Sequence, residues 1–436
     1  MSSKRKTKVG VLMAATVLLT VLAGSAVLAG GKPQPPPPPP PAPEYALTAL
    51  KPLPGCTDSA GEDVNDSGQV VGSSGGRAVL WPSATAAPIE LPLDEGYAGS
   101  WAGAINNVGC IVGRAGWVVS GRNHPVIWVP VDGGYQMQDL TGYSADDGSA
   151  TDINEGGYVT GLFLPNPDAG WPADRLGGVA FVIVPEDADG DGVVDTWFRD
   201  TDPGDGINDL MHPLDVFRDQ VSFWWVWPTA INDSGWVVGM AEGDFFGNYL
   251  VAGTFLIVPD YGDPGNPWVN MGAPDANGCS TNDRATILAG NKGWDAFLNN
   301  DRQTDNGSRM VQVVGNTAAL GDRAALFDVE VAGDGTVSFT SSVLPAATTR
   351  NWTFPLDIND SGLVVGHGYP TDVKRPKDTV EPLLWQPDKG TRALESLCDM
   401  AGFSDLGAAT SINGVGQIVG TGTTGGGQRG YVATPK

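Results

Sequence analysis

A nine-residue unit recurs along this chain and constrains its fold more than any other feature. The copy at 231–239 reads Ile-Asn-Asp-Ser-Gly-Trp-Val-Val-Gly, in which short polar residues and a glycine separate two apolar segments. Such residues close a tight turn, so each copy predicts a β-hairpin. The clear copies begin at Val64, Ile105, Ile153, Ile231, Ile358 and Ile412, and two eroded copies end at Gly290 and Gly315.

A second apolar segment follows each copy after a loop of variable length. These segments are short and bounded by Gly and Pro, which indicates buried strands. They lie at 78–81, 125–128, 180–184, 254–258, 296–298, 324–327, 382–385 and 430–432. In several copies a turn and a further strand come next, so one repeat amounts to two hairpins.

Repeats of four strands that recur about every 40–50 residues are typical of propeller blades. We therefore predict an all-β fold, a β-propeller of about seven (six to eight) four-stranded blades. The first strand, at 45–50, and the last, at 431–433, should share one blade and close the ring. An open β-solenoid is the alternative. A short helical turn within 394–403 is the one helical element that the sequence suggests.

The N-terminal residues predict an exported protein. Lys4, Arg5, Lys6 and Lys8 precede an almost wholly apolar stretch that ends in small residues at Ala29. This pattern predicts a signal peptide at 1–29, with an uncleaved membrane anchor as the alternative. Residues 30–44 are proline-rich and predict an extended spacer, which leaves 45–436 as the repeat domain. We expect a secreted, periplasmic or cell-surface location.

The net charge of −25 argues against a nucleic-acid partner, because phosphate binding requires a basic surface. An acidic exterior suits a soluble exported protein or one that binds cations. Export also permits disulfides, although the pairing is open and buried free thiols are the alternative. The four cysteines are Cys56, Cys110, Cys279 and Cys398.

In these repeats the chain resembles the HAF-repeat family of bacterial exported proteins. The resemblance rests on Ile-Asn-x-x-Gly-x-Val-Val-Gly, followed by a His-Ala-Phe-Leu-Trp-like strand that 124–128 (His-Pro-Val-Ile-Trp) matches best. It covers about 45–436, but Arg77, Arg323, Glu381 and Arg429 stand near the place of the family's histidine in other copies. The resemblance implies an extracellular repeat scaffold and supplies no catalytic residue.

The segment 187–195 (Asp-Ala-Asp-Gly-Asp-Gly-Val-Val-Asp) places acidic residues at alternate positions around glycines. Calcium takes six to eight oxygen ligands, and such a loop can supply several of them. We predict a structural calcium site formed by the carboxylates of Asp187, Asp189, Asp191 and Asp195 and the carbonyl of Val193. Phe198 at the twelfth position excludes an EF-hand, and the loop instead resembles the calcium hairpins of integrin-type propeller blades. A solvated acidic hairpin is the alternative.

Aromatic residues are concentrated at 223–227 (Phe-Trp-Trp-Val-Trp). In a strand, Trp225 and Trp227 would share a face, where they could stack on a sugar ring or pack between blades. Trp81, Trp128 and Trp385 recur at one position of the repeat, and we expect them in the core.

No catalytic motif stands out in the sequence. The three histidines are far apart, and the repeated Asn-Asp pairs are expected turn formers. We therefore expect an exported, non-enzymatic binding or structural module, stiffened by calcium, whose partner could be a glycan or an extracellular protein. The alternative is a carbohydrate-active propeller, either a glycoside hydrolase or a lectin-like glycan binder. Inward-facing acids such as Asp152, Glu242 or Asp295 beside an exposed tryptophan would favour that alternative.

Overall fold

The computed structural model describes residues 42–141, 147–164, 178–201, 208–214, 221–245, 249–259, 285–289, 293–317, 323–333, 336–345, 350–370 and 380–436. These belong to a unit that runs from Pro43 to Lys436, and this unit alone is described below. The predicted signal peptide at 1–29 and most of the spacer at 30–44 lie outside the described residues.

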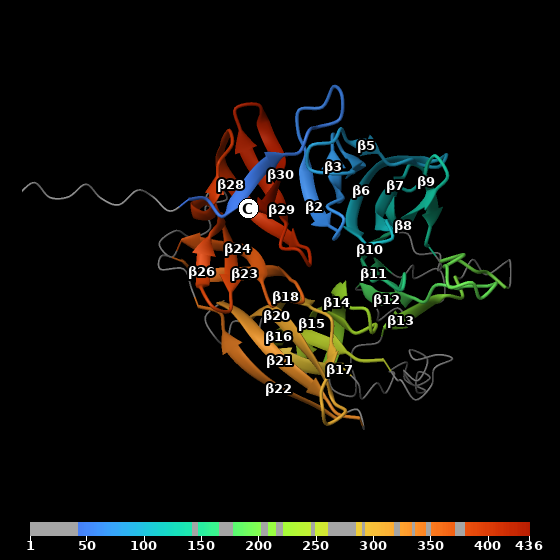
Figure 1. The fold of residues 1–436 in the computed structure, drawn as a ribbon. Coiled ribbons are helices and arrows are strands. Elements are labelled where there is room, and N and C mark those ends of the chain that lie inside the picture. Colours follow the sequence, from blue (N-terminus) through green and yellow to red (C-terminus); the bar gives the residue numbers. More distant parts are fainter. Residues whose placement is uncertain are drawn as a thin grey trace, which may run out of the picture. The chain divides into compact units, whose positions relative to one another are not determined.

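The described strands form seven small sheets, arranged as the blades of a seven-bladed β-propeller (Figure 1). Blade 1 holds β2 (Ala60–Val64), β3 (Val70–Ser74), β4 (Arg77–Trp81) and β5 (Ile89–Glu90). Blade 2 holds β6 (Tyr97–Ile105), β7 (Ile111–Trp117), β8 (Arg122–Val131) and β9 (Gly134–Asp139). Blade 3 holds β10 (Asp147–Ile153), β11 (Val159–Leu164), β12 (Val179–Ile183) and β13 (Met211–Leu214). Blade 4 holds β14 (Val221–Ile231), β15 (Val237–Phe245), β16 (Tyr249–Ile257) and β17 (Ala285–Ala289).

The other three blades follow the same order. Blade 5 holds β18 (Gly293–Leu298), β20 (Arg309–Thr317), β21 (Arg323–Val331) and β22 (Val337–Val343), with β19 (Arg302–Gln303) paired to β20. Blade 6 holds β23 (Arg350–Ile358), β24 (Val364–Pro370), β25 (Glu381–Gln386) and β26 (Gly390–Ala393). Blade 7 holds β28 (Phe403–Ile412), β29 (Ile418–Thr424), β30 (Gly427–Pro435), β1 (Tyr45–Ala49) and β27 (Cys398–Asp399). The predicted propeller of four-stranded repeats is confirmed.

The two ends of the repeat domain meet in blade 7. There β1 pairs antiparallel with β30 in a continuous register from Tyr45↔Pro435 to Ala49↔Tyr431, and Figure 1 shows the blue strand beside the red ones. The prediction that the first and last strands share a blade is therefore confirmed. This pairing leaves neither strand as an open edge and closes the ring with backbone hydrogen bonds.

Two parts of the repeat assignment were wrong. The segment ending at Gly290 is not the return strand of a hairpin, because β17 is the fourth strand of blade 4 and pairs with β16. The segment 296–298 lies in β18, the first strand of blade 5. The hairpin tip of blade 5 contains an inserted segment that includes β19. This insertion interrupts the nine-residue repeat unit, so the unit is not recognisable in the sequence of this blade.

The glycine that ends each repeat unit is required by a close backbone approach. Most first strands carry a β-bulge, for example between Pro355 and Asp357, opposite this glycine. A Cβ on Gly366 would lie 2.0 Å from the carbonyl oxygen of Phe354, and one on Gly239 would lie 2.1 Å from that of Trp227. No side chain can occupy these positions unless the bulge moves.

The core of each blade interface contains the apolar residues of the middle strands. Trp81, Trp128 and Trp385 are buried as predicted, and each indole N–H donates to a backbone carbonyl, for example Trp81 to Lys51 at 2.8 Å. The expected helical turn is a 3-10 helix at Leu394–Leu397.

Of the two states that the sequence left open for the cysteines, disulfides and free thiols, the described residues show free thiols. Cys56, Cys110 and Cys398 are free thiols, and Cys279 lies outside the described residues. Burial raises the pKa of Cys110 to about 11 and that of Cys398 to about 12, which keeps both as neutral thiols. Across the described ranges, no helix combines the length and apolar character needed to cross a membrane.

We expect Gly366→Ala to lower the free energy of unfolding by about 1–3 kcal/mol, the usual cost of overpacking, because its Cβ would collide with backbone. The matched control is Gly134→Ala in β9, where a Cβ would meet nothing within 4 Å, and it should stay within about 0.5 kcal/mol of wild type. Urea unfolding of both variants measures the difference. Equal stability of the two would contradict the close-approach explanation.

Candidate functional site

The tips of the first hairpins of all seven blades meet around the propeller axis. Each tip begins with a buried asparagine, and where a tip glycine is described after it, as at Gly68 and Gly235, its φ is positive. In six of the seven junctions the asparagine side-chain amide donates to the backbone carbonyl of the next asparagine, at 2.9–3.3 Å. The seven residues of this asparagine ring are Asn65, Asn106, Asn154, Asn232, Asn299, Asn359 and Asn413.

A second ring lies at the mouth. The residue after each asparagine donates its backbone N–H to the side chain of its counterpart in the next blade, as when Asn107 donates to Glu155 at 3.1 Å. The members of this mouth ring are Asp66, Asn107, Glu155, Asp233, Asn300, Asp360 and Gly414. Gly414 has no side chain to accept from Asp360, so the ring is interrupted there.

These tips surround a central cavity of about 420 Å³, within the range of small-molecule pockets. The mouth ring lines its opening, and Asp63, Asp357 and Ser411 lie on its wall. Among the described residues that line it there is no lysine or arginine. The cavity is therefore strongly acidic.

Three partly buried aspartates occupy the position two residues before the ring asparagine. Asp63, Asp152 and Asp357 each accept the backbone N–H of the next residue in their own strand, at 2.7–2.8 Å. Each also accepts an N–H from the following blade, at 2.8 Å: Ile105, Ile231 and Ile412 are the donors. The aspartates therefore cross-link three pairs of neighbouring blades.

Burial shifts the ionisation of all three carboxyls. It raises the pKa of Asp357 to about 7, raises that of Asp152 well above its ordinary value, and raises that of Asp63. The negative charge of Asp63 contributes to the raised pKa of the other two. In Asp357 the two N–H donors only partly offset the cost of burial, so this group takes up a proton close to neutral pH.

Ser411 connects two of these carboxyls. Its hydroxyl donates to Asp63 Oδ1 at 2.6 Å and is also hydrogen-bonded to Asp357. The wall of the cavity thus holds two aspartates beside one serine, and the pKa of one of them, Asp357, is about 7.

A different cluster lies farther along the inner strands. The Trp101 indole N–H donates to the Glu62 carboxylate, and the Arg114 guanidinium lies 5.1 Å from the centre of the Trp101 ring. Burial raises the pKa of Glu62. Gly103 makes room for this tryptophan, because a Cβ there would lie 2.7 Å from its ring.

The acids that were expected to face the axis, and the exposed tryptophans expected beside them, are only partly within the described residues. Asp152 belongs to the aspartate set around the axis, whereas the side chains of Glu242, Asp295 and Trp225 lie outside the described residues. Trp227 is 40% exposed, but no tryptophan lines the central cavity among the residues described. Asp63 and Asp357 were missed, although both stand directly before the repeated Val-Asn or Ile-Asn, as Asp152 does, and the other three clear copies lack this acid.

The acidic loop 187–195 connects β12 to β13. Carboxylate oxygens of Asp187, Asp189 and Asp195 lie within 4.8 Å of one another, and all three residues are exposed. Asp187 accepts the N–H groups of Gly190 and Gly192 at 2.7 and 2.8 Å. Asp191 stands outside this group and accepts from Val193 N–H at 2.8 Å. The structure therefore brings together three of the four predicted carboxylates.

Comparisons with known proteins bear on the architecture. No family model matches the chain, and no curated protein matches it. Among solved structures, it is similar to the Hadza microbial sialidase Hz136, at 11% identity and a TM-score of 0.39, over 84% of this chain and 73% of that one. It is also similar to Trypanosoma rangeli sialidase in complex with sialic acid, at 9% identity and a TM-score of 0.39, over 90% of this chain and 59% of that one.

The prediction that the chain is not an enzyme is corrected, because the solved structures named here are sialidases. The chain spans a little over half the length of the Trypanosoma rangeli proteins. At these identities the likeness concerns the fold, and no residue role or substrate is carried over. The resemblance to HAF-repeat proteins stays a prediction.

The aspartate set makes stability depend on pH. The pKa of Asp357 is about 7 when folded and near 3.8 for an unperturbed carboxyl, so between these values the folded state holds a proton that the unfolded state has lost. Its stabilising contribution is complete below the unfolded pKa and is lost as pH rises through about 7. We expect the free energy of unfolding to fall on the order of 3 kcal/mol between about pH 5 and about pH 8.

Urea unfolding across this pH range measures the effect. Asp357→Asn removes the titrating group and keeps the shape, so its unfolding free energy should vary distinctly less with pH than that of wild type. An unchanged pH profile in the variant would show that other groups govern the stability.

Proposed function

We propose that this chain is an exported carbohydrate-active propeller, a glycoside hydrolase whose reaction centre is the central cavity. The observation that carries the proposal is the pairing of Asp357, which holds a proton near neutral pH, with Asp63 on one cavity wall. Glycoside hydrolysis requires this combination of a carboxylic acid and a carboxylate. Export rests on the N-terminal sequence.

Asp357 would act as the general acid. Its raised pKa keeps a proton available for the oxygen of the departing sugar, and general acid catalysis typically contributes about 10²–10⁴ in rate. Asp63 would act on the anomeric side, either by activating water or by stabilising positive charge. Ser411, which donates to Asp63 and is also hydrogen-bonded to Asp357, would hold the two carboxyls in position.

The mouth ring would hold the sugar hydroxyls. Hydroxyl groups both donate and accept, and the ring offers carboxylate oxygens together with asparagine amides. The acidity of the cavity disfavours anionic sugars, so the substrate would be a neutral glycan.

Asp357→Asn and Asp63→Asn should each lower kcat at least about 100-fold on any glycan that the wild type hydrolyses, because each removes one reacting carboxyl. Asp152→Asn is the matched control, since Asp152 makes the same cross-blade bond but is not among the residues lining the cavity. We expect it to stay within about fivefold of wild type. A panel of aryl glycosides and neutral polysaccharides supplies the measurement.

Two results would refute the proposal. One is that no member of the panel is hydrolysed, and the other is that Asp152→Asn loses as much activity as Asp357→Asn. Thermal unfolding of the three variants at about pH 5 separates loss of chemistry from loss of fold.

We also propose that the loop 187–195 binds a calcium ion with a structural role. Its support is the convergence of three exposed carboxylates, whose mutual repulsion a cation would relieve. Hard oxygen donors are the ligands that calcium prefers, and backbone carbonyls, Asp191 and water would complete the shell. Bound calcium would fix the long connection between β12 and β13.

Calcium at about 100 times its dissociation constant should raise the unfolding free energy by roughly 2.7 kcal/mol, and excess chelator should reverse this. Asp189→Asn combined with Asp195→Asn should abolish the rise in melting temperature. Asp132→Asn, an exposed aspartate in the β8–β9 turn, should leave it intact. The site would be ruled out if calcium did not change the melting temperature, or if the rise in melting temperature persisted in the double variant.

A further inference from the structure

The asparagine ring is broken at one junction, between blades 5 and 6. The side-chain amide of Asn299 donates to Gln312 Oε1 at 3.3 Å, and no hydrogen bond joins it to the Asn359 carbonyl among the described residues. In blades 1 and 7 the corresponding amide makes both bonds. Asn65 donates to Gln69 Oε1 at 2.8 Å and to the Asn106 carbonyl at 3.1 Å.

This break leaves complementary hydrogen-bonding capacity on its two sides. The Asn299 amide has a second hydrogen that elsewhere in the ring crosses to the next blade. The Asn359 carbonyl accepts Gly362 N–H at 2.9 Å, which leaves one lone pair that elsewhere in the ring receives the crossing bond. One hydroxyl group between them could accept from the amide and donate to the carbonyl.

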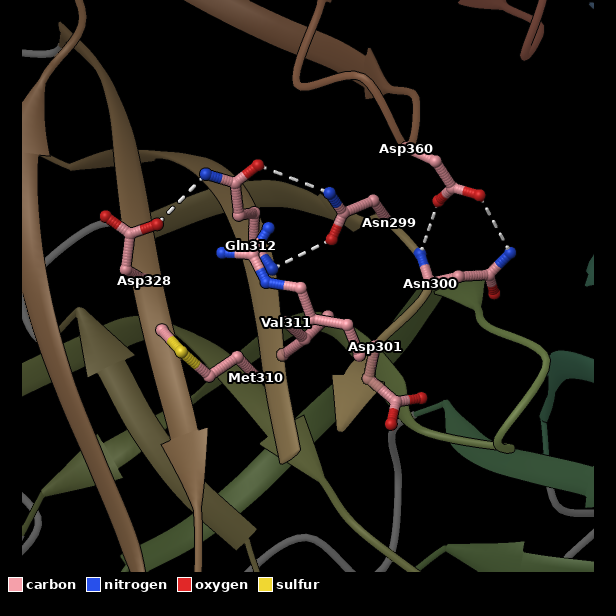
Figure 2. Close-up of a pocket in the computed structure, with 9 residues that line it drawn as sticks. Asn299, Asn300, Asp301, Met310, Val311, Gln312, Asp328 and Asp360 are labelled. Carbon is pink, nitrogen blue, oxygen red and sulfur yellow. Dashed lines mark hydrogen bonds between the residues drawn. The ribbon is translucent and has the colours of Figure 1, made fainter. Parts of the chain in front are cut away.

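A pocket of about 210 Å³ lies at the same junction (Figure 2). Gln312 crosses it, and its amide N–H donates to Asp328 Oδ1 at 2.9 Å. Asn300 donates to both oxygens of Asp360, at 2.9 and 3.3 Å. Asn299, Asn300 and Asp360 also line the central cavity, so this side pocket opens beside the proposed reaction centre.

The composition of the side pocket selects a neutral polyhydroxyl ligand. A phosphate or other anion would meet the carboxylates of Asp328 and Asp360. A metal cation would compete with the amides of Gln312 and Asn300, which already donate to these carboxylates. Sugar hydroxyls can use the amide donors, the remaining acceptors and Arg302 together, while Met310 offers an apolar contact to a ring face.

We propose that the side pocket between blades 5 and 6 is a glycan subsite, which holds the sugar unit next to the one bound in the central cavity. The substrate class is then a neutral oligosaccharide of at least two units rather than a simple monoglycoside. Asp328 and Gln312 determine this preference. The inference rests on the proposed glycoside hydrolase function. It adds the minimum length of the substrate and the residues that determine the preference for that length.

Binding of the full chain to an array of neutral monosaccharides and their matched di-, tri- and tetrasaccharides tests the subsite without requiring turnover. The wild type should bind the best disaccharide at least about tenfold more tightly than its monosaccharide, as one additional set of sugar contacts predicts. Asp328→Asn and Gln312→Ala should reduce this ratio to below about threefold. Asp63→Asn, in the central cavity, should leave the ratio near the wild-type value.

The same variants separate this inference from the proposed function. Hydrolysis of an aryl monoglycoside should be lost in Asp357→Asn and should survive in Asp132→Asn, the exposed-turn control. If monoglycosides are hydrolysed but the length preference is absent or survives both side-pocket variants, the subsite is wrong and the reaction centre stands. If oligosaccharides bind with that preference but nothing is hydrolysed, the subsite stands and the reaction centre is wrong. Failure of every glycan to bind would overturn the subsite.

Discussion

The propeller depends on one hydrogen bond repeated around its axis, in which the side-chain amide of a ring asparagine donates to the backbone of the next at six of the seven junctions. Such a bond requires the hairpin tip to lie at a set depth and angle, because the same side chain also closes its own turn through Oδ1, as Asn232 does with Trp236 N–H at 2.9 Å. A buried amide left without partners costs about 1–3 kcal/mol. The asparagine therefore couples the local turn to the packing of neighbouring blades, and this explains why it recurs with so little variation.

The three partly buried aspartates add a cross-blade bond at a cost that the asparagines avoid. A carboxylate loses its hydration on burial, and two backbone donors only partly replace it. The following blade carries a small residue at the matching position, Ala104, Ala230 or Ser411, which leaves space for the carboxyl group. Asparagine or serine could accept the same N–H groups without the ionisation cost. Asp152 shows that this arrangement also occurs away from the cavity, whereas Asp63 and Asp357 lie on the cavity wall.

The architecture could be predicted from the sequence because each repeat contains the residues that form its own turn, its strands and the close approach between their backbones. Six copies of the hairpin predicted the blades, and the unpaired strands at 45–50 and 431–433 predicted the closure that β1 and β30 make. Prediction failed in blades 4 and 5. In blade 5 the insertion around β19 separates Asn299 from Gln312 and removes the glycine that marks the turn. The assignment of function failed for another reason. Asp63 and Asp357 lie 294 positions apart in numbering, and only ring closure brings both to Ser411.

Function in a symmetric ring has to arise where the repeats differ, since a feature present in every blade serves the ring itself. The differences around this axis are few: three aspartates, the glycine at Gly414 and the uncrossed junction at Asn299, where the asparagine amide makes no hydrogen bond to the described residues of the next blade. Asp357 lies in the blade that follows the uncrossed junction, and Gly414 interrupts the mouth ring in the next one. The departures from symmetry on blades 5, 6 and 7 thus adjoin one another. This clustering gives the cavity a chemically distinct side, against which an asymmetric ligand such as a glycan chain can take one orientation.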